Sequence, residues 1–127
     1  MNIFIREDSS LPIYEQIVLA VKNSILGHET SPGDMLPSIR SLAKDLGISV
    51  ITTKRAYEEL EKEGLIYSEP GRGFFVSHVN KNLLLEEQLQ GLESSLSDLI
   101  QEAKHIGISR EEFTDMLRLL WGKEEDS

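Results

Sequence analysis

Apolar residues recur every three or four positions along residues 12–26, which is the spacing of one face of an α-helix. Pro12 suits the first turn of such a helix, and Gly27 suits its end. Ser9 or Ser10 can cap its N-terminus. The segment therefore predicts an amphipathic helix that turns one face toward a core.

Two further helical patterns follow, and a short turn separates them. Residues 38–46 carry apolar side chains on one face, and residues 50–63 do the same. Gly47 lies in the turn, Ser49 is a good N-cap for the second segment, and Gly64 suits its end. Two helices joined by a short turn that contains glycine form a helix-turn-helix.

After this second segment the apolar spacing changes to one typical of strands. Residues 65–68 and 74–77 have the composition of two strands, and the glycine-rich residues 69–73 between them suit a tight hairpin. A helix-turn-helix followed by a hairpin is a winged helix-turn-helix. Residues 3–5 predict one more short strand.

A separate tail begins near the polar residues 80–82. Its apolar residues are spaced alternately by four and three positions, which is the a/d pattern of a coiled coil. They are Leu85, Leu89, Leu92, Leu96, Leu99, Ala103 and Ile106. The pattern predicts one long helix that ends at Gly107.

A last helix is indicated by Ser109 and Glu112, which match a capping box. Its apolar face holds Phe113, Met116, Leu117, Leu120 and Trp121. Two amphipathic helices cannot bury both apolar faces alone, so we expect the tail to pair two chains; packing within one chain is the alternative. The predicted fold is mainly α with a small β hairpin: a winged helix-turn-helix in residues 1–80 and a two-helix dimerisation tail in residues 81–127.

The net charge of −9, from 13 Lys and Arg against 22 Asp and Glu, argues at first against a nucleic-acid ligand. The charge is unevenly distributed, however. Residues 81–127 carry −6 of it, whereas residues 37–57 hold four basic residues and one acidic residue. The sequence therefore predicts a local basic face on the helix-turn-helix and an acidic tail.

No residue pattern indicates catalysis or a metal site. The chain has no cysteine, and its histidines, at positions 28, 78 and 105, are scattered. Gly71 and Gly73 lie in a hairpin and not at a strand-to-helix junction, so they do not make a phosphate-binding loop. We expect no enzymatic activity and no cofactor. Without an apolar run of about 20 residues or a signal peptide, we also expect no membrane association and a cytoplasmic location.

Several short words occur in a set order between residues 12 and 76. They are Pro12-Ile13-Tyr14-Glu15-Gln16-Ile17, Leu36-Pro37-Ser38-Ile39-Arg40, Gly47-Ile48-Ser49, Ala56-Tyr57-Glu58-Glu59-Leu60, Gly64-Leu65-Ile66 and Gly71-Arg72-Gly73-Phe74-Phe75-Val76. By these words the segment resembles the DNA-binding domain of GntR-family bacterial transcription regulators. The short tail is similar to that of the YtrA branch. This resemblance implies a dimeric repressor, of a kind that often serves transporter operons.

The resemblance also implies which residues contact DNA. Arg40 matches the DNA-contacting basic residue of the family, and the wing carries Arg72 between Gly71 and Gly73. The start of the recognition helix supplies Ser49, Val50, Ile51, Thr52, Lys54 and Arg55. Hydroxyls at a helix N-terminus suit phosphate oxygens, and Arg or Lys can reach guanine. The alternative for these cations is ordinary surface charge or, for Arg40, an ion pair with Asp45 or Glu58.

Val50 and Ile51 depart from the family pattern, in which a basic residue and a small polar residue are common at these positions. We hypothesise that one of them contacts thymine methyl groups. The alternative is that they pack against the first helix or the wing.

These features predict a homodimeric, sequence-specific repressor that binds an inverted repeat in double-stranded DNA. The alternative is an acidic winged-helix adaptor that binds protein and not DNA. The seam between tail and winged domain leaves room for a small-molecule effector, although no set of residues identifies one.

Overall fold

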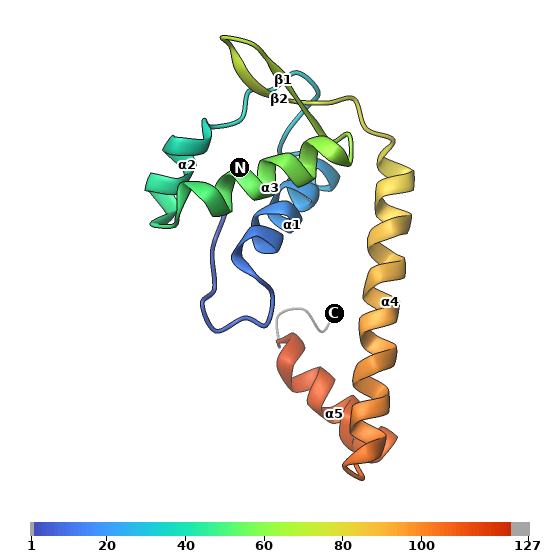
Figure 1. Cartoon of the computed structure of the whole chain (residues 1–127). Helices are drawn as coiled ribbons and strands as arrows, with labels where there is room; N and C mark the ends of the chain where they lie inside the picture. Colours follow the sequence, from blue (N-terminus) through green and yellow to red (C-terminus); the bar gives the residue numbers. More distant parts are fainter. Residues whose placement is uncertain (1, 123–127) are drawn as a thin grey trace. The chain divides into compact units, whose positions relative to one another are not determined.

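The computed structural model describes residues 2–122 (Figure 1). In chain order its elements are α1 (Ile13–Leu26), α2 (Ile39–Leu46), α3 (Val50–Lys62), β1 (Ile66–Glu69), β2 (Gly73–Val76), α4 (Lys81–His105) and α5 (Arg110–Trp121). The chain divides into two compact units between Leu85 and Glu86. The mainly helical fold with a small hairpin is as predicted. No helix in the described range is long and apolar enough to cross a membrane.

The core of the first unit lies where α1 packs against α3. Ile17, Val21 and Ile25 of α1 are almost fully buried, as are Ala56 and Leu60 of α3. Residues from both strands and from the start of α4 complete the same cluster, namely Ile66, Val76 and Leu84. Because each buried aliphatic side chain of this size stabilises the fold by about 1.5–3 kcal/mol, this cluster fixes the position of α3.

Tyr57 connects α3 to the segment that leads into α2. Its ring is 1% exposed and meets Phe74 edge-on, with ring centroids 5.0 Å apart. Its hydroxyl donates a hydrogen bond of 2.7 Å to the Pro37 carbonyl oxygen. Burial raises the pKa of the Tyr57 hydroxyl well above its ordinary range, so the group remains a neutral donor.

We expect Tyr57→Phe to destabilise the protein by about 1–3 kcal/mol, because the ring still packs while the Pro37 carbonyl loses its donor. Urea unfolding followed by circular dichroism measures this change. Tyr67→Phe is the matched control, since the Tyr67 side chain is 39% exposed. Equal stabilities of the two variants would show that the buried hydrogen bond contributes nothing.

The N-terminal segment departs from two predictions. Residues 3–5 form no strand, although Ile3 and Ile5 pack against the core. At the next residue, the Gln16 side chain accepts from the Arg6 amide at 2.8 Å and donates to the Arg6 carbonyl at 2.9 Å. The predicted cap by Ser9 or Ser10 is also wrong. The N-cap of α1 is Pro12, without a side-chain hydrogen bond, and the Ser9 hydroxyl instead accepts from the Leu11 amide.

The hairpin forms the wing. The bounds of both strands differ by one residue from the predicted ranges 65–68 and 74–77. β1 pairs with β2 in antiparallel register from Ile66↔Val76 to Glu69↔Gly73. Leu65 lies outside β1 because its amide donates a hydrogen bond of 3.0 Å to the Leu60 carbonyl at the end of α3. Gly71 has a φ of 76°, which glycine adopts without strain at the tip of the turn.

The loop before α2 lies along the free edge of β2. The amides of Gly33 and Leu36 donate to the carbonyls of Val76 and Phe74, at 2.7 and 2.9 Å. In return the Val76 amide donates to the Asp34 carbonyl at 2.8 Å. The wing is therefore hydrogen-bonded to the helix-turn-helix at its base.

The second unit contains most of α4, and α5. The capping box is confirmed: Ser109 Oγ accepts from the Glu112 amide at 3.1 Å, and the Glu112 carboxylate accepts from the Ser109 amide at 3.0 Å. This backbone hydrogen bond lowers the pKa of Glu112. The α5 helix therefore begins at the predicted residue.

Candidate nucleic-acid interface

One strip along α3 is turned to solvent. Ile51, Lys54, Arg55 and Glu58 are spaced by three and four residues and are all exposed. The opposite face is buried, with Thr53 at 0% exposure. The core therefore presents this strip outward, and its first three members lie in the half of the helix nearest the turn after α2 (Figure 1).

The turn between α2 and α3 is set by local backbone chemistry. Gly47 ends α2 in the left-handed region, with a φ of 67°. Ser49 Oγ accepts from the Thr52 amide at 3.0 Å and donates to Thr52 Oγ1 at 2.7 Å. The Ser49 hydroxyl is therefore engaged in the cap, and the Thr52 hydroxyl has its own hydrogen left to donate.

The two apolar residues at the start of α3 are both accessible. Ile51 is 81% exposed and Val50 is 46% exposed. Packing against α1 or the wing therefore does not account for Ile51. The Ile51 side chain lies on the same strip as Lys54, about one helical turn away.

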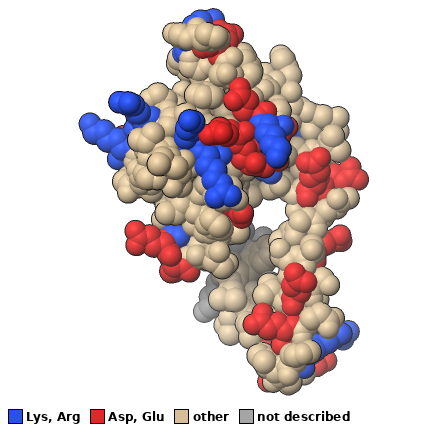
Figure 2. Space-filling model, in the orientation of Figure 1, with Lys and Arg blue, Asp and Glu red and all other residues tan. Residues whose placement is uncertain are grey.

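Three cations form a patch at the helix-turn-helix end of the first unit. Arg40 and Lys44 of α2 and Lys54 of α3 are exposed. Among residues 2–122, none of the ion pairs involves them, so neither Asp45 nor Glu58 pairs with Arg40. Figure 2 shows several Lys and Arg over α2 and the start of α3, a mixture of acidic and basic side chains over the rest of α3, and mainly Asp and Glu along α4. The local basic face predicted from the sequence is present.

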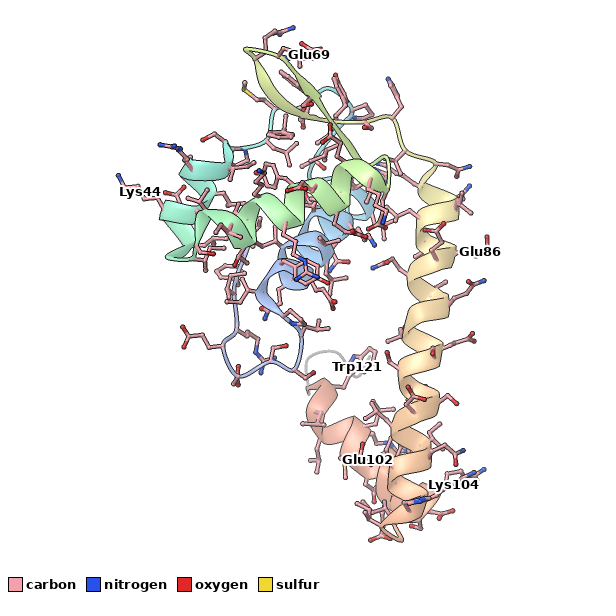
Figure 3. The ribbon with its side chains drawn as sticks, in the orientation of Figure 1. Lys44, Glu69, Glu86, Glu102, Lys104 and Trp121 are labelled. Atoms are coloured by element: carbon pink, nitrogen blue, oxygen red, sulfur yellow. The ribbon has the colours of Figure 1, made fainter. Side chains whose placement is uncertain are left out.

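Lys44 is one of the four basic residues in residues 37–57, but the resemblance does not assign it a contact with DNA. Figure 3 shows its side chain extending outward from α2. It lies four residues after Arg40, so the two share one helical face. This four-residue spacing is the feature of the sequence from which Lys44 could have been predicted as a DNA contact.

The other two candidate cations have intramolecular partners. The Arg55 guanidinium carbon lies 3.8 Å from the centroid of the Tyr14 ring in α1. At the wing, Arg72 Nη1 is 2.7 Å from Glu69 Oε2. The structure thus leaves Arg40, Lys44 and Lys54 exposed on the helix-turn-helix and places Arg55 beside α1 and Arg72 at the wing.

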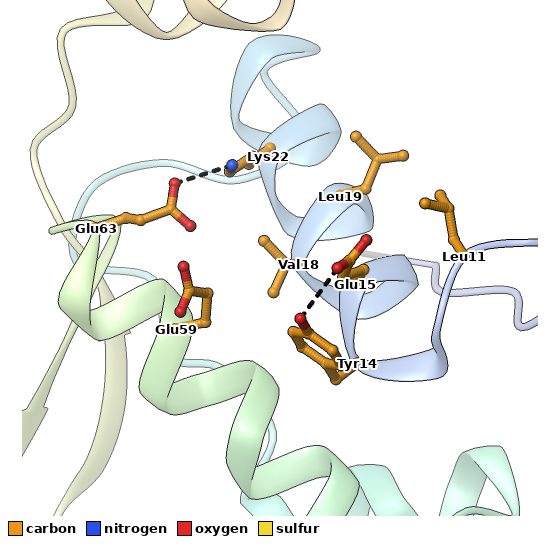
Figure 4. A pocket seen from close by; sticks show the side chains of 8 residues that line it. All are labelled: Leu11, Tyr14, Glu15, Val18, Leu19, Lys22, Glu59 and Glu63. Carbon is orange, nitrogen blue, oxygen red and sulfur yellow. Dashed lines mark hydrogen bonds and ion pairs between the residues drawn. The ribbon is translucent and has the colours of Figure 1, made fainter. Parts of the chain in front are cut away.

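A pocket of about 350 Å³ lies between α1 and α3 (Figure 4). Glu15, Glu59 and Glu63 line it, together with Leu19 and other apolar side chains. Lys22 Nζ forms an ion pair of 2.9 Å with Glu63. The acidic lining disfavours phosphate there. The described part of the chain contains no group of three or more side chains that could hold a metal ion.

The predicted dimerisation residues leave an apolar surface along α4 and α5. Leu92 is 65% exposed, and Leu85, Leu89, Leu96 and Leu99 are 43–52% exposed. On α5, Leu117, Leu120 and Trp121 are 48%, 80% and 62% exposed, and Phe113 is half-buried. Among the a/d residues of α4, only Ala103 is buried. Packing within each of the two units therefore does not cover these faces in residues 2–122.

Comparison with known proteins agrees with this geometry. Residues 13–76 match the family described as "Bacterial regulatory proteins, gntR family". The HTH-type transcriptional repressor YtrA of Bacillus subtilis is 37% identical over 110 residues, which are 87% of this chain and 85% of that protein. Such relatives are transcription regulators and not enzymes.

Solved structures give the same result. YtrA from Sulfolobus acidocaldarius, a GntR-family transcription factor, has a TM-score of 0.58 and 38% identity, covering 72% of this chain and 97% of that one. The DNA-binding domain of AraR in complex with operator ORX1 has a TM-score of 0.53 and 28% identity, covering 61% and 96%. On its winged helix-turn-helix, its matched residues and its YtrA-like relatives, the chain belongs to the GntR family of bacterial transcription regulators.

Proposed function

We propose that the protein is a homodimeric repressor that binds an inverted-repeat operator. The observation that carries this proposal is the patch of Arg40, Lys44 and Lys54 beside the exposed start of α3, on a chain whose net charge is −9. Concentrating unpaired cations on one end of an acidic molecule favours one orientation on DNA and disfavours others.

In this proposal α3 enters the major groove. Lys54 and Ile51 face base edges, while Arg40 and Lys44 contact the phosphate backbone on one side of the groove. The hydroxyl of Thr52 donates to a phosphate oxygen near the helix N-terminus. Arg72, released from Glu69 or shared with it, reaches the minor groove or its phosphates from the wing.

The apolar faces of α4 and α5 provide the contact between two chains. Pairing them buries the exposed leucines of the a/d seam, which water otherwise contacts. A two-fold dimer then places two recognition helices in successive major grooves, about 34–36 Å apart. This spacing requires an inverted repeat with half-sites about one helical turn apart.

A mobility-shift assay with DNA from upstream of the protein's own gene tests the proposal, and genomic fragments recovered with the purified protein extend the search. The likeness to YtrA makes transporter operons the first fragments to inspect. Binding that survives excess unrelated DNA and weakens steeply with salt supports a repressor. If no fragment is enriched, the protein is instead an adaptor that binds other proteins through its winged domain.

We expect thymine-to-uracil replacement in the half-sites to weaken binding by about 1 kcal/mol or more, because it removes the methyl groups that we assign to Ile51 or Val50. Fluorescence anisotropy on matched duplexes measures the difference. The variant that carries both Val50→Ser and Ile51→Ser is the control, since uracil should cost it nothing further. Equal affinity of the wild-type protein for both duplexes would refute the methyl contact.

A further inference from the structure

Arg55 differs from its neighbour Lys54 because an aromatic ring holds its charged group. The Arg55 guanidinium carbon is 3.8 Å from the Tyr14 ring centroid, well inside the distance of about 6 Å at which a cation is attracted to an aromatic face. A planar guanidinium can also stack on the ring, which an ammonium group cannot do. The ring therefore favours one position of Arg55 among the many that its long side chain could adopt.

Tyr14 is itself fixed. It lies in the first turn of α1, where its ring is half-buried and packs against the core cluster. Its hydroxyl donates a hydrogen bond of 3.0 Å to Glu15 Oε1. That hydrogen bond to a carboxylate raises the pKa of the Tyr14 hydroxyl, so the phenol stays neutral. The guanidinium thus rests on a platform that belongs to α1 and not to α3.

We propose that Tyr14 is a positioning residue for DNA binding: it holds Arg55 beside α1, so that Arg55 contacts a backbone phosphate at the edge of the major groove and not a base within it. This inference rests on the proposed repressor function. Ile51 and Lys54 remain on the accessible strip that faces the bases, whereas the Arg55 charge is drawn to the flank of α3 where α1 begins.

Fixing the side chain in advance has a physical consequence for affinity. A free arginine loses rotamer freedom when it binds a phosphate, and a stacked arginine has lost part of it already. Phosphate contacts set the register of a protein on the duplex without reading its sequence. Removing the platform should therefore weaken binding to all DNA sequences by a similar factor.

A double-mutant cycle tests this role. Tyr14→Leu, Arg55→Ala and the combined variant are titrated with a genomic fragment that the wild-type protein selects and with an unrelated duplex, over a series of salt concentrations. Tyr14→Phe is the matched control because it keeps the ring. We expect each single variant to bind both duplexes about two- to fivefold more weakly, with the combined variant no weaker than Arg55→Ala and Tyr14→Phe unchanged. Arg55→Ala should reduce the slope of log affinity against log salt by about one.

Three outcomes would overturn the role. Independent, additive losses would mean that the ring acts without Arg55, for example through stability. A loss confined to the selected fragment would mean that Arg55 reads a base. A Tyr14→Phe variant as weak as Tyr14→Leu would assign the effect to the hydroxyl. Failure of the repressor function itself is distinguishable, because the wild-type protein would then select no fragment and Arg40→Ala would change nothing.

Discussion

Arg40→Ala and Lys54→Ala are each expected to lower operator affinity by about 1–3 kcal/mol, which is roughly 5- to 150-fold. Both side chains are exposed and unpaired in the described range, so the substitutions remove charge without disturbing the core. Lys54→Ala should also relax discrimination against altered half-sites, since Lys54 lies on the strip that we propose faces the bases. Arg40→Ala should weaken binding to every sequence and reduce the salt dependence by about one contact.

Lys62→Ala provides the matched control for these two variants. Lys62 is an exposed lysine on the same helix, in its last turn, at the end away from the basic patch. Titration of all three variants against one operator at several salt concentrations separates a specific contact from a change in overall charge. An equal loss in Lys62→Ala would show that net charge, and not the patch, controls affinity.

Leu92→Glu is expected to convert the proposed dimer to monomers and to lower operator affinity by about 10²–10⁴-fold, because two linked DNA-binding domains bind far more tightly than one. Leu92 lies within the a/d seam of α4 and is 65% exposed in the single chain. A carboxylate in a paired seam would be buried without a partner, which costs several kcal/mol. Analytical ultracentrifugation measures the assembly state, and anisotropy on whole and half operators measures the affinity.

Ser94→Glu adds the same charge to the same helix but off the seam, so it should leave the dimer intact. A Leu92→Glu variant that remains dimeric would exclude this face as the contact between chains. A monomeric variant with undiminished operator affinity would instead exclude the dimer as the DNA-binding form.

The helices and the hairpin could be predicted because their signals are local and repeated. The spacing of apolar residues identified α1, α2 and α3, and Ser49 and Gly47 defined the turn between the last two. The capping box at Ser109 was equally local. The strand expected at residues 3–5 is absent, although Ile3 and Ile5 pack against the core, because an alternation of apolar residues along the chain does not indicate whether a partner strand is present.

The candidate site was predictable in outline but not in its pairings. Segment charge predicted the basic face, and the resemblance placed Arg40 and the start of the recognition helix on it. The stacking of Arg55 on Tyr14 joins residues from two helices, and its geometry follows from how α1 packs on α3. The Arg72–Glu69 pair depends in the same way on the register of the hairpin.

The hydrogen bonds between residues 33–36 and β2 have a thermodynamic consequence for the wing. A two-stranded hairpin alone is only marginally stable in water, and a flexible wing would have to fold as it met the duplex. With a third backbone segment along its edge, the wing is already ordered in the unbound protein. The wing contact that we propose would therefore carry little penalty in conformational entropy, and even a single weak interaction by Arg72 would add to the affinity.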